Sequence, residues 1–262
     1  MGAAKKHKQA FFREHARCCF CGGSQEATTI DHVPLRAAFA GNIGPEGFEF
    51  PACAACNRGT SGSEQVFALY VRLLDQIDEN YDQALIGTLI RGVRNNYPRL
   101  LPNPRLGTSS KRRALRHYGW ELERGQLLDD VSLVGVPEQF DEHARMNVKK
   151  LLAALYYRHT GAVVSDACGV LWGWSQQGLP GVDEAQDVLF DGMPELVIGK
   201  RTNTSIGDQF AYRWGINADE GLFGFAAGFG AGLFVFGASA PWGKVSQLEN
   251  WERFEPPRSP QP

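Results

Sequence analysis

The chain has 262 residues, a formal net charge of −2 at pH 7, a sequence pI near 6.3, and 43% hydrophobic residues. This length allows one large domain or two smaller ones with a substantial core. The balanced charge excludes a globally basic protein, so any contact with nucleic acid must come from a local patch. The first nine residues lack the apolar run of a signal peptide. We therefore expect a cytoplasmic protein whose paired cysteines bind metal rather than form disulfides.

Two Cys-x-x-Cys pairs stand in the first quarter of the chain, Cys18 with Cys21 and Cys53 with Cys56. Four thiolates on two short knuckles suit a tetrahedral zinc ion. Redox chemistry is the competing interpretation, but it needs one pair only and usually a thioredoxin-like βαβ context. The presence of two pairs therefore favours a structural zinc site.

Three residues between and just after these knuckles are suited to phosphodiester hydrolysis. A short β-prone run ends at Asp31 and His32, and Asn57 directly follows Cys56. An imidazole titrates near neutrality, so His32 can act as a general base. Carboxylate and amide oxygens suit Mg²⁺ or Mn²⁺, so Asp31 and Asn57 can ligate a catalytic divalent ion.

The full pattern is Cys-x-x-Cys, Asp31-His32-Val33-Pro34, then Cys-x-x-Cys-Asn, and it resembles the zinc-bearing HNH endonucleases. The segment Asn57-Arg58-Gly59-Thr60-Ser61 is also similar to the last HNH segment of CRISPR-guided nucleases. This resemblance covers about residues 18–61. Outside it, the segment Tyr156-Tyr157-Arg158-His159-Thr160-Gly161 and the aromatic C-terminal strands resemble a group of uncharacterised bacterial HNH-like proteins. The HNH resemblance implies a ββα-metal unit in which His32 is the general base and Asp31 and Asn57 hold the catalytic metal.

Apolar spacing predicts three helices along the chain. The first covers Ser63–Asp78 and follows a capping box formed by Ser61 and Glu64. The second covers Tyr81–Arg94, before Pro98. The third covers Glu142–Arg158, and Gly161 suits its C-cap.

A basic stretch lies between the second and third predicted helices. No Asp or Glu occurs from Gln83 to Trp120, and proline, glycine and serine make its middle a loop. Such a stretch is typical of a phosphate-binding surface for DNA or RNA, although a solvated basic face fits the same pattern. The residues concerned are Arg91, Arg94, Arg99, Arg105, Lys111, Arg112, Arg113 and Arg116.

The uncharged run from Gly221 to Ala240 is long enough to be considered as a membrane span. Its six glycines, its phenylalanines and the alternating residues just before it favour β-hairpins instead, so we expect no membrane partner. The sequence thus predicts an α+β protein. It has a zinc-bound HNH-like domain over residues 1–62, a helical segment with a basic loop over 63–118, a β-rich C-terminal α+β domain over 119–255, and a disordered tail over 256–262.

Two functions are compatible with these patterns. The first is a metal-dependent HNH-type endonuclease acting on DNA. The second is a zinc-scaffolded module that binds nucleic acid or a protein partner and has an idle pocket. The second interpretation rests on the absence of an asparagine between Phe48 and Ala52, where the family has its middle asparagine, and on the size of the C-terminal part. The joint occurrence of Asp31, His32 and Asn57 favours the enzyme.

Overall fold

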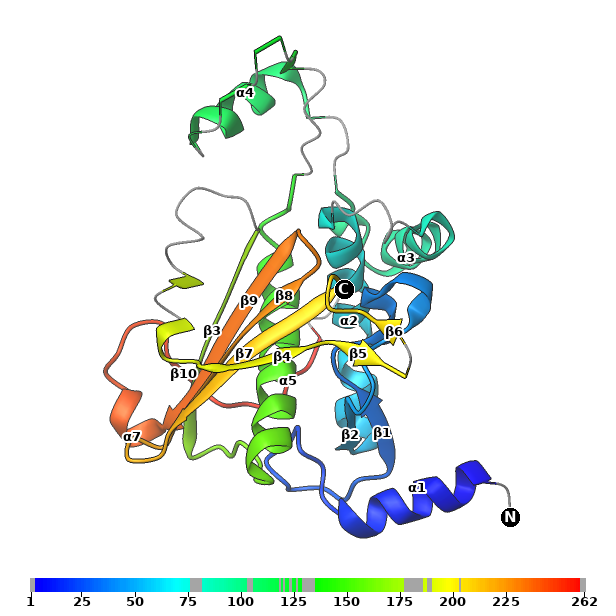
Figure 1. Ribbon diagram of the computed structural model, residues 1–262, viewed down its shortest axis with the longest axis vertical. Coiled ribbons are helices and arrows are strands. Elements are labelled where there is room, and N and C mark those ends of the chain that lie inside the picture. Colours follow the sequence, from blue (N-terminus) through cyan, green and yellow to red (C-terminus); the bar gives the residue numbers. More distant parts are fainter. Residues whose placement is uncertain are drawn as a thin grey trace.

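The computed structural model describes residues 3–75, 82–102, 106–117, 119, 121–122, 124–125, 127–128, 135–176, 186–187, 190–202 and 204–259. Arg105 and the final residues 76–78 of the first predicted helix lie outside this set. The mixed α and β structure expected from the sequence is confirmed (Figure 1).

The N-terminal part forms a helix, a hairpin and a second helix. Helix α1 (Ala3–Glu14) precedes the first cysteine knuckle. Strand β1 (Thr29–His32) pairs antiparallel with β2 (Glu49–Ala52), which places His32 opposite Glu49. The connection between these strands contains two 3-10 turns, η1 (Arg36–Ala38) and η2 (Ala40–Asn42). Helix α2 (Ala54–Leu74) begins directly after β2.

The start of α2 corrects the prediction for this region. The helix begins at the second knuckle rather than at Ser63, and its N-cap is Cys53, whose side chain accepts a hydrogen bond from the amide of Cys56. Ser61 is therefore not a cap but lies inside the helix, where its hydroxyl donates to the carbonyl of Arg58. The capping-box pattern of Ser61 and Glu64 placed the start too late, because the cap from Cys53 and the packing of the buried face decide the boundary.

The second predicted helix is present as α3 (Gln83–Asn96), and the carboxylate of Asp82 caps it by accepting from the amide of Leu85. The 3-10 turn η4 (Pro98–Leu100) follows. Helix α4 (Thr108–His117) occupies part of the stretch that the sequence predicted to be a loop.

The third predicted helix is present as α5 (Phe140–Thr160), and it ends at Gly161 with a φ of 72°. This left-handed conformation suits glycine, as the sequence predicted. Helix α5 packs against α2 on one side and against the large sheet on the other. It is consequently buried along most of its length and connects the N-terminal unit to the C-terminal strands.

The large sheet has six antiparallel strands in the order β10-β3-β9-β8-β7-β4. The uncharged run forms the β8–β9 hairpin, which confirms the hairpin interpretation, and none of the described helices could cross a membrane. A small β5–β6 hairpin and the short helix α7 (Trp242–Val245) complete the fold. The strands are β3 (Cys168–Gln176), β4 (Glu195–Ile198), β5 (Lys200–Arg201), β6 (Thr204–Ser205), β7 (Phe210–Asn217), β8 (Leu222–Phe229), β9 (Leu233–Pro241) and β10 (Glu252–Arg253).

One hydrophobic core includes residues from all three predicted segments, so the boundaries at residues 62 and 118 do not separate independent cores. Aromatic rings make the junction: Phe39 and Phe48, from the β1–β2 connection, both pack edge-on against Phe210 of β7. The hairpin is thus supported by the C-terminal sheet as well as by α2.

Residues 256–259 of the tail, predicted to be disordered, return to α2. The amide of Ser259 donates to the carbonyl of Gly59 at 2.7 Å, and its hydroxyl accepts from the amide of Ser63 at 3.1 Å. Gly59 and Ser63 are i,i+4 partners in a regular helix, so the tail bridges a turn of α2.

Candidate metal centre and active site

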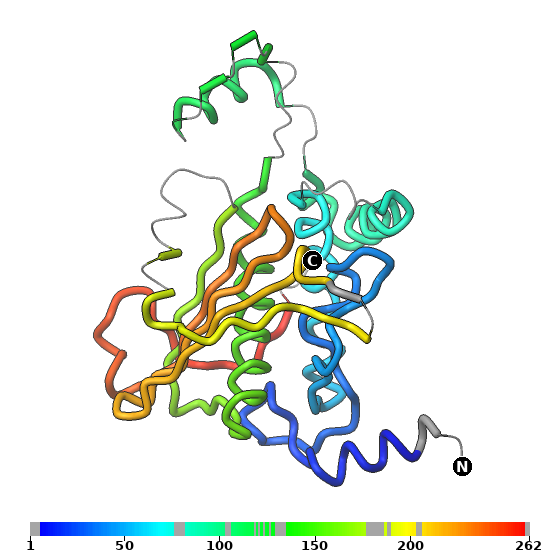
Figure 2. Tube along the Cα trace, viewed as in Figure 1, coloured from blue at the N-terminus to red at the C-terminus, as the bar shows by residue number. Residues whose placement is uncertain are grey.

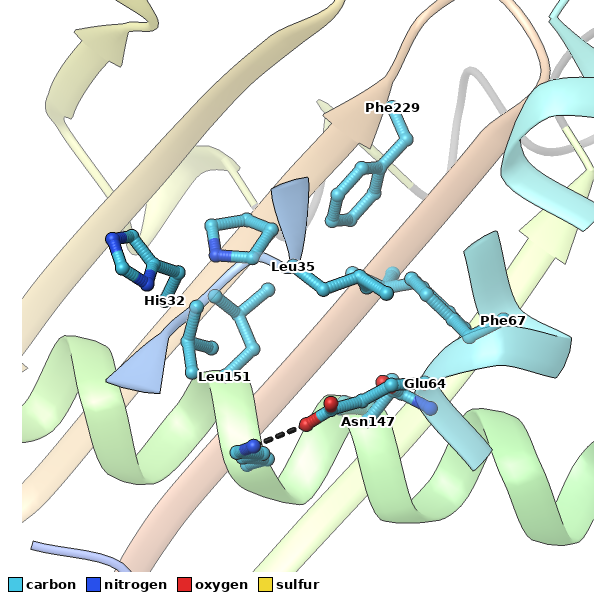
Figure 3. Close-up of a pocket in the computed structure, with 12 residues that line it drawn as sticks. His32, Leu35, Glu64, Phe67, Asn147, Leu151 and Phe229 are labelled. Atoms are coloured by element: carbon cyan, nitrogen blue, oxygen red, sulfur yellow. Dashed lines mark hydrogen bonds and ion pairs between the residues drawn. The ribbon is translucent and has the colours of Figure 1, made fainter. Parts of the chain in front are cut away.

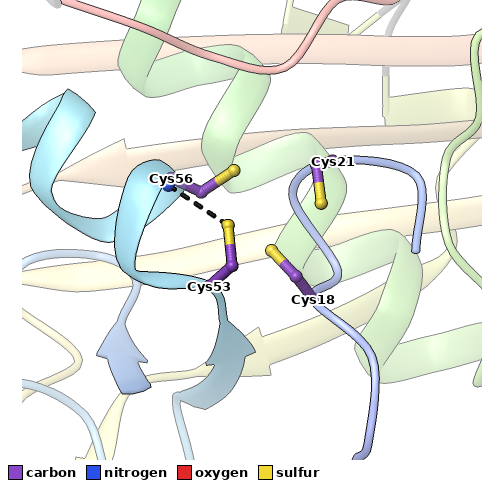
Figure 4. A group of neighbouring side chains, drawn as sticks. All are labelled: Cys18, Cys21, Cys53 and Cys56. Atoms are coloured by element: carbon purple, nitrogen blue, oxygen red, sulfur yellow. Dashed lines mark hydrogen bonds between the residues drawn. The ribbon is translucent and has the colours of Figure 1, made fainter. Parts of the chain in front are cut away.

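The two cysteine knuckles converge at the base of the β1–β2 hairpin. The Sγ atoms of Cys18, Cys21, Cys53 and Cys56 all lie within 4.8 Å of one another, and Figure 4 shows them turned toward a common point. The first knuckle is tied to β2 by the amide of Cys19, which donates to the carbonyl of Pro51 at 2.9 Å. This group could hold a metal ion such as zinc.

The electrostatics of the four thiols fit a bound cation. A hydrogen bond from Cys56 lowers the pKa of Cys18 to about 5, and the same contact raises the pKa of Cys56. Thiols this close repel one another when several are ionised, and a divalent cation removes that penalty because thiolates are its ligands.

The remaining described cysteines lie outside the group. Cys19 is fully buried, and burial raises the pKa of its thiol well above the ordinary value. Cys168 is partly buried on β3. A buried thiol with a raised pKa behaves as a small apolar residue.

His32 ends β1 with its side chain 31% exposed. Its Nε2 lies 2.5 Å from Nη2 of Arg36 and 3.2 Å from Oε1 of Glu49. Burial and Arg36 lower the pKa of His32 below its ordinary value of 6.5, against the opposing effect of Glu49. The imidazole is therefore mainly neutral at physiological pH, as a general base requires.

Asp31 points to the opposite side of β1 and is 7% exposed. Its Oδ2 forms an ion pair with Nζ of Lys150 on α5 at 2.7 Å. Burial raises the pKa of Asp31 to about 6, although Lys150 acts in the other direction. At neutral pH the group is mainly a carboxylate with one cationic neighbour.

Asn57 lies in the first turn of α2. Its Nδ2 donates to Oγ1 of Thr29 at 3.0 Å, which ties the turn to the first residue of β1. The amide oxygen of Asn57 takes no part in this bond and is of the type that suits a hard cation. The structure thus places Asp31, His32 and Asn57 on two adjoining elements, β1 and α2. Within the described part of the chain, no hydrogen bond or ion pair joins these three side chains directly.

The carboxylate of Asp31 has one buried cationic neighbour. Its Oδ2 lies 2.7 Å from Nζ of Lys150, a distance at which the ammonium donates a charge-assisted hydrogen bond. A carboxylate has further lone pairs, and oxygen lone pairs of this kind suit a hard cation. Asp31 and Asn57 thus offer the ligand types that Mg²⁺ or Mn²⁺ would need.

A small cavity lies behind β1, and Figure 3 shows His32 on one side of it and Glu64 on the other. Its volume is about 10 Å³, room for the centre of roughly one water molecule. Most of its lining is apolar, including Leu35, Phe67 and Phe229. It cannot admit a nucleotide, so a polynucleotide strand would have to approach His32 from the exposed side.

The basic stretch is divided between elements. Arg91 and Arg94 lie on α3, Arg99 lies in η4, and Lys111, Arg112, Arg113 and Arg116 lie on α4. All of these side chains are exposed except Lys111, which is partly exposed and donates to the carbonyl of Leu128. Helix α4 stands at one end of the long axis of the molecule, whereas β1 and β2 lie toward the other end (Figure 2).

Sequence reasoning missed the charged residues that surround the candidate site. Arg36 and Arg201 are the cations that act on His32, and Arg201 donates to the carbonyl of Gly44 at 3.1 Å. Lys150 and Glu64 are the charged neighbours of the Asp31 carboxylate, on the opposite face of β1 from His32. The position of Arg36 four residues after His32 was a usable indication, but nothing in the spacing of Lys150 or Arg201 points to this site.

Comparison of the chain with known protein families, with the curated proteins and with the solved structures found no match. The functional conclusion therefore rests on the geometry described above.

Proposed function

We propose that the chain is a metal-dependent, HNH-type endonuclease that hydrolyses phosphodiester bonds in DNA. The observation that carries the proposal is the placement of Asp31 and His32 on the first strand of a hairpin and of Asn57 in the first turn of the helix that follows it. The four cysteines hold these elements at their bases, with zinc as the structural metal. In this proposal β1, β2 and α2 form the ββα-metal unit.

His32 acts as the general base. A lone pair on Nε2 accepts a proton from water, the water oxygen bonds to phosphorus, and the bond from phosphorus to the leaving sugar oxygen breaks. The two contacts of Nε2 suit the two states of the base. The neutral ring accepts from Arg36, and the protonated ring donates to Glu49, whose carboxylate then stabilises the imidazolium.

Asp31 and Asn57 provide the oxygen ligands for the catalytic ion. A divalent ion held there would neutralise charge on the phosphate and on the leaving oxygen. Arg36 and Arg201 are exposed and act electrostatically on His32, so their guanidinium groups can bind phosphate oxygens near it. When Arg36 binds phosphate, it also releases the lone pair of His32 for catalysis.

The experiment is cleavage of supercoiled plasmid by zinc-loaded protein with added Mn²⁺ or Mg²⁺, compared with His32→Ala. Loss of a general base costs on the order of 10²–10⁴ in rate, so the variant should leave almost no nicking. His159→Ala is a matched control, because His159 is a partly buried histidine that contacts Tyr212 and Trp214 instead. Zinc content and melting temperature are recorded for each protein.

Nicking that persists in His32→Ala at the rate of the His159→Ala control would refute the assignment of the base. Nicking by neither protein, with zinc bound, would favour the second candidate function, a zinc-scaffolded binding module. One observation supports that alternative: Asp31 is already paired with an internal cation, Lys150.

A further inference from the structure

Lys150 occupies a position that links the two halves of the proposed catalytic unit. Its side chain is 2% exposed, and its ammonium contacts three oxygens from two different elements. One is Oδ2 of Asp31 on β1, at 2.7 Å. The others belong to α2: Oγ1 of Thr60 at 2.9 Å and Oε1 of Glu64, with which it forms a close ion pair.

The contacts of Thr60 extend this link to the turn that carries the amide ligand. The hydroxyl of Thr60 lies 3.2 Å from the carbonyls of both Cys56 and Asn57, and 2.8 Å from Oε1 of Glu64. Lys150 is thus connected to Asp31 directly and to the turn containing Asn57 through a single side chain. A shift of the ammonium would change the position of one proposed ligand relative to the other.

The ammonium is firmly held. Two carboxylates, those of Asp31 and Glu64, balance the charge of this buried ammonium. The ammonium also lies 5.2 Å from the ring centroid of Phe20, in the first knuckle loop.

We propose that Lys150 is a positioning residue of the catalytic metal site. It fixes the carboxylate of Asp31 against the first turns of α2, so that the oxygens of Asp31 and Asn57 stay at the spacing that one divalent ion requires. This inference rests on the proposed function, and it makes α5, a C-terminal element, part of the catalytic unit. Groups that hold metal-ligating carboxylates in this way commonly change metal affinity by 10–100-fold when they are removed.

The test is a titration of zinc-loaded, full-length protein with Mn²⁺ alone, in which free Mn²⁺ is followed by electron paramagnetic resonance. Asp31→Asn identifies the site that depends on Asp31. Lys150→Met should weaken that site by about 10–100-fold, with zinc content unchanged. A second variant, Lys150→Met with Glu64→Gln, removes a carboxylate left without its cation and guards against failure to fold.

Lys149→Met is the matched control. Lys149 is the neighbouring residue on α5, is 4% exposed and pairs with Glu252 at 3.3 Å, away from Asp31. Both single variants should lower the melting temperature, but Lys149→Met should keep the Mn²⁺ affinity of the wild type within about threefold. This contrast separates positioning of the ligand from general stability.

Unchanged or tighter Mn²⁺ binding in both Lys150 variants would overturn the inference, because the ammonium would then be a competitor of the ion or a purely structural group. Wild-type protein without an Asp31-dependent Mn²⁺ site would also overturn it, even where nicking depends on His32. Conversely, weaker Mn²⁺ binding in the Lys150 variants, together with an absence of nicking by the wild type, would uphold the inference while refuting the proposed endonuclease.

Discussion

Two different clamps hold the same hairpin and helix together. The first is the group of four cysteines, whose members all fall between residues 18 and 56. The second is the buried ion pair network in which Lys150 joins Asp31 to Glu64, and its members lie on β1, α2 and α5. In the proposed account the first clamp depends on a bound metal and is local in sequence, whereas the second is made by the protein alone and connects distant segments.

The comparison shows why the candidate site needs the C-terminal part. The cysteines lie next to the end of β2 and at the start of α2, but the hydrogen bonds of their thiols do not reach Asp31. The network from α5 does so, and the sheet behind α5 keeps that helix in place. An isolated fragment ending near residue 62 would retain the first clamp and lose the second.

Loss of the metal clamp should have the largest effect. We expect Cys53→Ser to abolish stoichiometric zinc binding and to unfold the hairpin and the start of α2, because structural zinc contributes on the order of 10 kcal/mol in small zinc domains. Metal analysis and circular dichroism would measure both effects.

Cys19→Ala is the control for this change, since Cys19 is also buried but its thiol lies outside the group. The control should keep its zinc. Zinc loss from Cys19→Ala, with retention by Cys53→Ser, would show that the sulfur ligands have been assigned incorrectly.

Acid should have a smaller effect on stability, through a buried polar contact between α2 and α5. His143 is 3% exposed, its Nδ1 lies 3.0 Å from the hydroxyl of Ser63, and burial lowers its pKa to about 4. The unfolded chain protonates near 6.5, so the stability that this histidine contributes is complete above pH 6.5 and is lost as pH falls toward 4. The loss between pH 7 and 5 should be about 2 kcal/mol.

Denaturant unfolding of the wild type and of His143→Gln at both pH values measures this contribution. The variant should lose less stability on acidification than the wild type. The raised pKa of Asp31 has the opposite effect on the free energy of unfolding, because its protonation stabilises the folded state as pH falls from about 6 to 3.8. Asp31 is present in both proteins, so its contribution cancels in the comparison. His117→Gln on α4 serves as the control, and equal acid sensitivity of the wild type and His143→Gln would contradict the prediction.

The smallest effect concerns which basic surface contacts DNA. Arg112 and Arg113 lie on α4, whereas Arg36 and Arg201 lie beside His32. Each phosphate contact contributes about −0.9 to the slope of log K against log salt, so a pair that contacts DNA should reduce the slope by roughly 1.8 when both members become alanine. Binding is measured in the His32→Ala background.

We expect the Arg36 and Arg201 pair to change the slope. A changed slope for the Arg112 and Arg113 pair alone would assign DNA binding to the basic stretch. It would also show that Arg36 and Arg201 do not contact phosphate. Unchanged slopes for both pairs would place the contact elsewhere on the surface.

The sequence predicted those features that depend on spacing. The convergence of the two knuckles, the helix ending at Gly161 and the β8–β9 hairpin all follow from local patterns. The roles of Asp31, His32 and Asn57 remain predictions. The predicted start of α2 was wrong because the helix is capped by Cys53 rather than by the Ser61 capping box. Lys150 could not have been assigned to the site, because its role depends on how α5 packs against β1 and α2.

The most direct test of the central claim is anomalous X-ray scattering from crystals of the zinc-loaded protein soaked in Mn²⁺. The account predicts two metal positions, zinc among Cys18, Cys21, Cys53 and Cys56, and Mn²⁺ bound by oxygens of Asp31 and Asn57. A zinc peak alone, with Asp31 still paired to Lys150 at saturating Mn²⁺, would contradict the account and leave the hairpin and helix as a scaffold.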